Sequence, residues 1–357
     1  MKRLRVVVLY GGRSVEREVS RVSARTIVQA LDRSKYDVVA IGVGENGRFL
    51  SPADSSRRLA AGGVPERIRR SEPDAEALVP LEIGPGRADV VFPIIHGTTG
   101  EDGTLQGFLD FLGIPYVGAG VTGSAIGMDK PVFKALLNGA GLPTPRSAVI
   151  RPSDRGAKAR ELAGRLPLPL FVKPATGGSS VGVTKVKDLV GLDAALDEAF
   201  RYDERALVEE GIDARELECA VLGDETPRAS VVGEVVPARE FYDYDDKYRD
   251  DRAKLVIPAD VTAAVSTEVR RLAVEAFRLC GLSGMARVDF FLERGTDRVL
   301  VNELNTLPGF TAISMYPKLW EASGLALPDL LDELISLALA RKKRRDRLSH
   351  EPPAELA

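Results

Sequence analysis

Residues 286–311 read ARVDFFLERGTDRVLVNELNTLPGFT, and this stretch decides the fold. Polar and apolar residues alternate over residues 287–292, and residues 299–304 form a second run rich in β-branched and aliphatic side chains. Both patterns are typical of strands. The residues between them, 293–297, read ERGTD and have the composition of a turn. The stretch therefore predicts an antiparallel hairpin.

The register of this hairpin determines which polar groups meet. If Asp289 lies opposite Glu303, then Arg287 lies opposite Asn305, and all four side chains share one face because residues two apart in a strand point the same way. Two carboxylates and an amide offer the hard oxygen ligands that Mg²⁺ prefers, with its other positions left to water and phosphate. We therefore expect a site for a magnesium nucleotide. The alternative is an ordinary hairpin with a solvated polar face.

The composition excludes several classes of protein. The chain has 357 residues, 44% hydrophobic and 28% charged, which is ordinary for a globular protein of two or three domains. Its 49 basic and 52 acidic residues give a net charge of -3, so we expect no nucleic acid and no anionic membrane as partner. Two cysteines argue against a disulfide framework, and the short apolar run near the N-terminus is no signal peptide. We expect a cytoplasmic protein.

The N-terminal part has an α/β pattern. A buried strand is expected at residues 4–10, followed by a helix that Ser14 opens, and further strands at residues 38–43 and 90–95. Residues 51–86 are rich in Ser, Pro, Gly and charge and show no clear periodicity, so we expect a variable excursion there.

The rest of the chain alternates helices, strands and glycine-rich connections. The expected elements are a helix at 105–112, a short strand at 114–117, a glycine-punctuated connection at 118–127, a helix at 133–138, a strand at 170–173, strands within 218–236, a helix at 261–280 and a terminal helix. The expected domains are 1–127 (an N-terminal substrate-binding α/β domain), 128–217 (central), 218–345 (C-terminal) and 346–357 (a charged tail). The basic run at 340–347 is read as a helix end, where positive charge favours the dipole.

A glycine-rich loop follows the strand at 170–173. It reads KPATGGSSVG over residues 173–182, so its amide groups can wrap phosphate oxygens while Lys173 adds a positive charge. The lysine precedes the glycines, which is not the order of a Walker A loop. Glycine-rich turns are usually only turns, so the phosphate interpretation depends on the metal site of the hairpin.

Three further segments carry candidate groups. His96 opens HGTTGEDG after a strand, where it either contacts a ligand or holds its own loop by hydrogen bonds. Glu16 lies in a first helical turn, where a carboxylate is favoured electrostatically or receives a cationic amine. Residues 241–249, FYDYDDKYR, fit a lid that brings Lys247 or Tyr248 over the substrates, or a surface loop with packed tyrosines.

Taken together, these motifs resemble the ATP-grasp superfamily and, within it, the D-alanine:D-alanine ligase family of cell-wall synthesis. The resemblance covers nearly the whole chain in order. Its motifs are GGRSVEREVS from Gly11, HGTTGEDGTLQG from His96, MDK from Met128, VKPATGGSSVGV from Val172, FYDYDDKY from Phe241, ARVDF from Ala286 and NELNTLPGFTAIS from Asn302.

The resemblance implies an α/β (α+β) ATP-grasp fold with a Rossmann-like N-terminal domain and a two-domain module that grips ATP between two sheets. It implies an ATP site with two Mg²⁺ ions, which Mn²⁺ can replace, held by Asp289, Glu303 and Asn305. The implied ATP-binding residues are Lys130, Lys173, Ser180, Glu209, Glu210, Ile212, Glu216 and Lys247.

The resemblance also implies a reaction. The carboxylate of one D-alanine attacks the γ-phosphate of ATP, and the amine of a second D-alanine displaces phosphate from the acyl phosphate. Arg287 and the Gly309 amide would stabilise the oxyanion, while His96, Ser314 and the Met315 amide would contact substrate. Glu16 would hold the first ammonium, linked to Ser179 and Tyr248. The base for the second amine is not identified, and a homodimer is expected because the family often dimerises.

Two other interpretations remain open at this point. One is a related ATP-grasp ligase, such as one that accepts D-lactate. Tyr248 argues against it, because depsipeptide ligases tend to carry another residue there. The other is a nucleotide-binding protein without turnover, which would be favoured if a metal ligand or Arg287 were missing, and none is.

Overall fold

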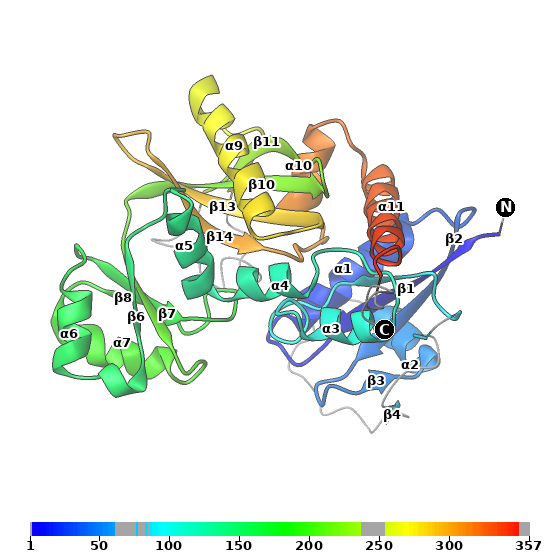
Figure 1. Cartoon of the computed structure of the whole chain (residues 1–357), viewed down its shortest axis with the longest axis horizontal. Coiled ribbons are helices and arrows are strands. Elements are labelled where there is room, and N and C mark those ends of the chain that lie inside the picture. The colour runs from blue at the N-terminus through cyan, green and yellow to red at the C-terminus, as the bar shows by residue number, and fades with distance from the viewer. Residues whose placement is uncertain (1, 61–75, 78–82, 85, 237–253, 350–357) are drawn as a thin grey trace, which may run out of the picture.

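The structure is a computed structural model that describes residues 2–60, 76–77, 83–84, 86–236 and 254–349. Its strands form three sheets, two of five strands and one of four. The N-terminal and C-terminal five-stranded sheets lie side by side, and the four-stranded sheet extends away from them at the end of the molecule opposite the N-terminus (Figure 1). This arrangement is mixed α/β, as expected.

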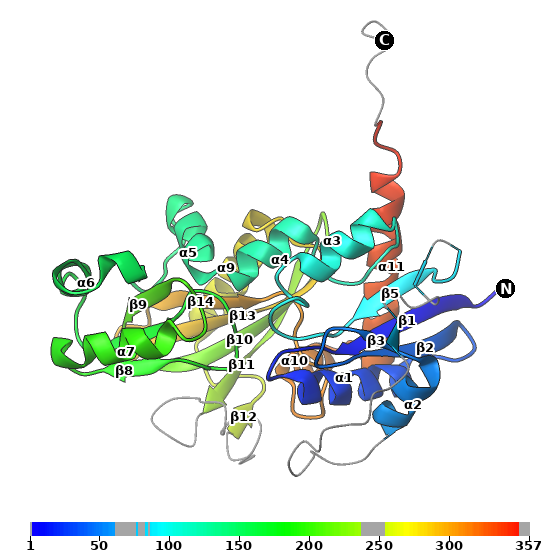
Figure 2. The same ribbon diagram turned by 90° about the horizontal axis from the view of Figure 1, so that it is seen from below.

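The N-terminal sheet has the order β4-β3-β2-β1-β5, with β1 parallel to both β2 and β5. Its strands are β1 (Leu4–Gly11), β2 (Tyr36–Val43), β3 (Phe49–Leu50), β4 (Glu76–Ala77) and β5 (Val90–Pro93). Alternate residues of β1 belong to two different cores, because Val6 and Val8 pack with α1 (Arg17–Ala30) while Val7 and Leu9 pack with α3 (Thr104–Phe111). The sheet is therefore covered on both faces, as Figure 2 shows.

The four-stranded sheet is antiparallel and has the order β6-β9-β7-β8. Its strands are β6 (Ser147–Ile150), β7 (Leu170–Pro174), β8 (Thr184–Val186) and β9 (Ala206–Glu210). Its core includes residues of α6 (Ala157–Ala163) and α7 (Leu192–Ala199). The glycine-rich loop leaves the end of β7 and so lies at one end of this sheet.

The C-terminal sheet has the order β12-β11-β10-β13-β14. Its strands are β10 (Ala214–Gly223), β11 (Arg228–Val236), β12 (Lys254–Val256), β13 (Gly284–Glu293) and β14 (Val299–Asn305). One core includes α9 (Ala263–Leu279) and α5 (Lys130–Gly139). The other includes α10 (Met315–Ala322), α11 (Leu327–Arg345) and residues of β1 and β5, so a continuous core joins the N- and C-terminal sheets.

Most of the expected elements are confirmed, and three predictions need correction. The connection expected at 118–127 is wrong, because α4 (Val121–Met128) is a helix. Two glycines let α4 approach the C-terminal sheet closely: a Cβ at Gly127 would lie 2.7 Å from the side chain of Thr306, and one at Gly123 would lie 2.6 Å from that of Leu282. Close packing thus explains the glycines that the sequence suggested were loop residues.

The other two corrections concern residues 114–117 and residues 51–86. The strand expected at 114–117 is only an isolated bridge between Tyr116 and Val91. The excursion expected at 51–86 contains helix α2 (Pro52–Ala60) in its described part. Among the described residues, no helix is long and apolar enough to cross a membrane.

Candidate active site

The register predicted for the hairpin is confirmed. In β13 and β14, Arg287 pairs with Asn305 and Asp289 pairs with Glu303. A β-bulge follows, between Asp289 and Phe290, where the register shifts by one residue. The hairpin therefore presents its polar residues together at the end of the strands that faces the N-terminal domain (Figure 1).

Arg287 is held between two carboxylates. Its guanidinium donates to both oxygens of Asp289, with Nε–Oδ1 and Nη2–Oδ2 distances of 2.7 Å, and its Nε lies 2.9 Å from Oε2 of Glu218 on β10. Burial alone would lower the pKa of Arg287, but Asp289 and Glu218 outweigh burial and raise it well above its ordinary value. The guanidinium is a fixed, permanent positive charge at the cavity.

The hairpin residues suit a magnesium ion by the chemistry of their donors. Asn305 donates its Nδ2 to Oδ2 of Asp289 at 2.9 Å, which leaves the amide oxygen available as a ligand. A carboxylate has about four lone-pair positions, so Asp289 can accept from Arg287 and Asn305 and still bind a cation. Asp289, Glu303 and Asn305 therefore fit a hard divalent cation. No group of three or more His, Cys, Asp or Glu side chains suited to a metal occurs in the described part of the chain.

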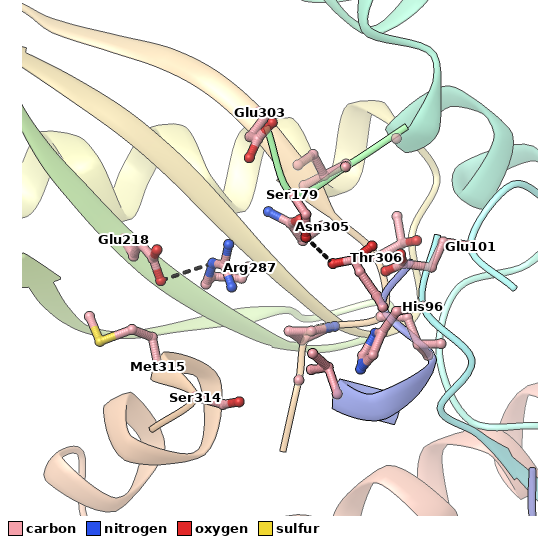
Figure 3. A pocket seen from close by; sticks show the side chains of 18 of the residues that line it. His96, Glu101, Ser179, Glu218, Arg287, Glu303, Asn305, Thr306, Ser314 and Met315 are labelled. Atoms are coloured by element: carbon pink, nitrogen blue, oxygen red, sulfur yellow. Dashed lines mark hydrogen bonds and ion pairs between the residues drawn. The ribbon is translucent and has the colours of Figure 1, made fainter. Parts of the chain in front are cut away.

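A cavity of about 140 Å³ lies where the hairpin faces the N-terminal domain and the glycine-rich loop. It is smaller than the roughly 300–1,000 Å³ of sites for drug-sized ligands, so it suits small molecules. Figure 3 shows Glu218 and Arg287 on one side of it and His96 and Glu101 on the other. Of the candidate residues, the lining includes Glu16, His96, Lys130, Ser179, Arg287, Glu303, Asn305, Gly309, Ser314 and Met315.

The loop after β14 and the start of α10 carry Gly309, Ser314 and Met315, the residues predicted to donate to the oxyanion and to a substrate carboxylate. A Cβ at Gly309 would lie 2.8 Å from Oγ of Ser314, so a side chain here would displace the Ser314 hydroxyl. Ser314 Oγ accepts from the Thr311 N–H at 2.9 Å, and Ser314 precedes the first residue of α10, Met315. The N–H groups of a first helical turn have no partner within the helix and point toward its N-terminal side, where an anion is favoured.

Glu16 approaches the cavity from the start of α1. Ser179 donates its Oγ to Oε1 of Glu16 at 2.5 Å, so the expected contact between these residues is present. Gly97 and Gly178 flank the other oxygen, because a Cβ on either residue would lie 3.3–3.4 Å from Oε2. Ser179 has a positive φ of 53°, which turns the glycine-rich loop toward Glu16.

His96 and Glu101 anchor the loop after β14 to the N-terminal domain. The backbone of Leu307 hydrogen-bonds to both side chains, and Glu101 Oε2 also accepts from the Gly97 N–H at 2.5 Å. Burial lowers the pKa of His96, so the imidazole is neutral at pH 7, and its Nε2 has no partner among the described residues. Burial and the charge of Glu16 raise the pKa of Glu101 to about 8.

The lysines expected at the nucleotide are held by other parts of the chain. Lys130 donates its Nζ to the Gly177 carbonyl at 2.6 Å, which ties α5 to the glycine-rich loop. Lys173 Nζ lies 2.6 Å from Oε2 of Glu209. Glu209 also pairs with Lys134 of α5, which is only 2% exposed. Burial would raise the pKa of Glu209, but the two lysines lower it, so this carboxylate is ionised.

The remaining candidate residues lie outside the cavity lining. The side chain of Glu210 is directed at Arg146, whose Nε donates to it at 2.8 Å, and the Glu210 backbone N–H donates to the Arg146 carbonyl at 3.0 Å. Ser180, Ile212 and Glu216 are half-buried on the glycine-rich loop and near the start of β10. The candidates Lys247 and Tyr248, with the lid interpretation of residues 241–249, lie outside the described residues.

Three residues of this region were not predicted from the sequence. Glu101 stands five residues after His96 in a motif that was recognised, but no role was given to it. Glu218 lies two residues after Glu216 and so shares a strand face with it. That spacing would have pointed to Glu218 only if the pairing of β10 with β13 had been known. For Lys134 the sequence offers no signal, because a lysine in a helix is usually exposed.

Two family models match the chain. The model described as D-ala D-ala ligase N-terminus matches residues 5–119, and the model described as D-ala D-ala ligase C-terminus matches residues 136–336. The first match holds Glu16, His96 and Glu101, and the second holds the glycine-rich loop and the hairpin.

Relatives and solved structures match over nearly the whole chain. The D-alanine–D-alanine ligase A of Chromobacterium violaceum is 48% identical, over 98% of this chain and 99% of that protein. The D-alanine–D-alanine ligase A of Escherichia coli is 46% identical, over 96% and 97%. The structure of the D-alanine–D-alanine ligase of Coxiella burnetii has a TM-score of 0.81 and 38% identity, over 97% of both chains. The VanG D-Ala:D-Ser ligase of Enterococcus faecalis has a TM-score of 0.80 and 33% identity, over 94% of this chain and 100% of that one.

Proposed function

Because this chain belongs to the D-alanine–D-alanine ligase family, it joins two D-alanine molecules at the expense of ATP, and we propose how its residues divide that reaction. The reaction passes through D-alanyl phosphate, releases ADP and phosphate, and supplies the dipeptide for peptidoglycan precursors. Its two steps have different needs: the first gathers negative charge at a phosphoryl group, and the second gathers it on a tetrahedral carbon.

Glu16 receives the ammonium group of the first D-alanine. Its carboxylate reaches the cavity and accepts from Ser179, which belongs to the glycine-rich loop. An ammonium group bound there directs the substrate's own carboxylate toward the hairpin, which carries Arg287 and the proposed magnesium ligands. Ser179 thus links the position of the first substrate to the loop that covers the phosphates, and Tyr248 completes that link from the lid.

Arg287 and the Gly309 N–H stabilise the oxyanion of the second step. Arg287 is oriented before substrate arrives by Asp289 and Glu218, and the Gly309 backbone approaches closely because it has no Cβ. Donors fixed in place before the reaction cost no reorganisation when charge develops. Ser314 and the Met315 N–H bind the carboxylate of the second D-alanine at the start of α10, and His96 contacts substrate from the opposite side.

Asp289, Glu303 and Asn305 would hold Mg²⁺, in the two-ion arrangement expected from the family, with Mn²⁺ as a substitute. Metal ions in this position would supply positive charge to offset that of the phosphate oxygens of ATP. Lys130, Lys173, Ser180 and Lys247 bind the phosphates. Glu209, Glu210 and Ile212 surround the adenine, and Glu216 holds the ribose.

We propose a cytoplasmic location and a homodimer for this protein, in keeping with its low net charge and with the family. The substrate assignment rests on one observation in particular: the pairing of β13 with β14 brings Arg287, Glu303 and Asn305 to the same cavity as Glu16.

The test is phosphate release from Mg-ATP with D-alanine, with the products identified by mass. The matched incubations contain L-alanine, D-alanine with D-lactate, and D-alanine with D-serine. Dipeptide formed from D-alanine alone is the expected result. A mixed product as the main one would contradict the second-substrate assignment, and nucleotide binding without turnover would contradict the catalytic one.

A further inference from the structure

Glu101 and Glu16 form a pair of carboxylates on the N-terminal side of the cavity, and both line it. Gly97 lies between them. Its N–H donates to Oε2 of Glu101 at 2.5 Å, and a Cβ at this position would lie 3.4 Å from Oε2 of Glu16. Glu101 therefore stands beside the carboxylate to which we assign the first ammonium group.

Within the described part of the chain, the groups around Glu101 supply little positive charge. Its hydrogen-bond partners are the backbone amides of Gly97 and Leu307, and its charged neighbours are Glu16, which raises its pKa, and the more weakly coupled Arg287, which lowers it. His96, which shares the Leu307 backbone, is neutral because burial lowers its pKa. Arg287 is already paired with Asp289 and Glu218. Two ionised carboxylates in this corner would repel each other without a matching cation.

We propose that Glu101 holds a proton in the ligand-free cavity and releases it to solvent when the ammonium group of the first D-alanine binds beside Glu16. The step is a simple ionisation: the O–H bond of the Glu101 carboxyl breaks, the proton goes to water, and no bond of the substrate changes. The inference rests on the proposed role of Glu16. It makes Glu101 a positioning residue, which matches the charge of the cavity to the charge of the substrate.

The direction of the pH effect follows from this exchange. The carboxyl of Glu101, with its pKa of about 8, is mostly protonated at pH 7 and mostly ionised at pH 9. The substrate binds to the ionised form, so binding must displace nearly one proton at pH 7 and almost none at pH 9. D-alanine affinity should accordingly rise as the pH increases from 6 to 8.

The experiment is calorimetric titration of the full-length protein with D-alanine, in the presence of Mg-ADP, which fills the nucleotide site without allowing turnover. At each pH from 6.5 to 9, the titration is repeated in phosphate, HEPES and Tris, whose heats of ionisation differ. The slope of the binding enthalpy against the buffer enthalpy gives the number of protons released. We expect a value approaching one at pH 7 that falls toward zero at pH 9.

The variant Glu101→Gln keeps the size and the acceptor oxygen of the side chain but has no proton to release, so it should bind D-alanine with no buffer dependence. Glu275→Gln, on the exposed pair of Glu275 with Arg271, is the matched control and should behave like the unmodified protein. A contact with Leu307 that only anchored the loop would not make the binding enthalpy depend on the buffer.

The outcomes separate this inference from the proposed function. Binding of D-alanine without proton release at any pH, in a protein that still forms the dipeptide, would overturn the role of Glu101 alone. Release that persists in Glu101→Gln would assign the proton to another group and overturn it too. If that variant does not fold, the pH dependence of release in the unmodified protein decides. Failure of D-alanine to bind would remove both proposals.

Discussion

The two sides of the cavity differ in how their charged side chains are paired. On the hairpin side, Arg287 is matched by Asp289 and Glu218 before any ligand arrives. On the N-terminal side, Glu16 and Glu101 face the cavity beside a neutral His96, and their hydrogen-bond donors include Ser179 and the Gly97 amide, which are uncharged.

This difference indicates how the cavity orients an amino acid. The N-terminal side offers acceptors to a cation, while the hairpin side offers a fixed guanidinium and the start of α10 to anions. On the proposed assignment, a zwitterion binds with its ammonium group toward Glu16 and its carboxylate toward Arg287. Orientation of reactants is a large part of what such an enzyme contributes.

The largest effect is expected from Arg287→Ala, which removes the matched charge from the hairpin side. Without it, Asp289 and Glu218 lose their shared cation and the oxyanion loses a donor, so kcat should fall by about 10²–10³. ATP affinity should change much less. A coupled assay of ADP formation gives kcat, and calorimetry with a non-hydrolysable ATP analogue gives the affinity.

Arg287→Lys is the companion variant, because it keeps the charge but loses the bidentate contact with Asp289. It should recover only part of the rate. An equal loss of nucleotide affinity and of turnover in Arg287→Ala would show that Arg287 acts on ATP. The assignment of Arg287 to the oxyanion, and with it the contrast between the two sides of the cavity, would then be wrong.

Glu16→Gln tests the N-terminal side. A hydrogen bond between charged groups contributes about 1.5–3 kcal/mol, so KM for the first D-alanine should rise about 10- to 100-fold, with a smaller effect on KM for ATP. Glu45→Gln is a suitable control, since that side chain is 57% exposed and pairs with Arg17 at the surface. An unchanged KM for D-alanine would mean that the ammonium binds elsewhere.

The same two sides differ in how far the sequence predicts them. The hairpin was predictable because its strands and turn lie within about twenty residues, and a period of two assigns all four polar groups to one face. The bulge after Asp289 was not, since it depends on how the strands twist in the sheet.

The N-terminal side depends on contacts between distant segments, and no local pattern encodes them. Glu101 acquires its environment from Leu307, which is about two hundred residues away in the chain. Glu218 reaches Arg287 because β10 pairs with β13, and α4 is a helix although its glycines are typical of loops. The environment and conformation of such residues depend on burial and tertiary packing, and both follow from the complete fold.

Glu218→Gln sharpens the comparison by removing one of the two charges that match Arg287. The amide keeps the shape of the side chain, and Asp289 still holds the guanidinium, so we expect kcat to fall about tenfold, which corresponds to about 1.4 kcal/mol. KM for ATP should stay constant. Glu225→Gln, whose side chain is 76% exposed, controls for a general loss of charge. A fall as large as that of Arg287→Ala would mean that Glu218 itself contacts the reactants.

The smallest effect concerns stability without ligand. Burial and Glu16 raise the pKa of Glu101 from its ordinary value of 4.5 to about 8, so between these pH values the folded state binds more protons than the unfolded state. Stability must then fall as the pH rises through this window, and Glu101→Gln removes that contribution. In thermal unfolding, the Tm of the variant minus the Tm of the unmodified protein should increase by on the order of 2 °C between pH 6 and pH 9.

Saturating D-alanine should make this difference in Tm smaller, because the bound ammonium group compensates the ionised carboxylate of Glu101. A constant difference in Tm at every pH would mean that Glu101 only anchors the Leu307 loop, and the two sides of the cavity would then carry the same balance of charge.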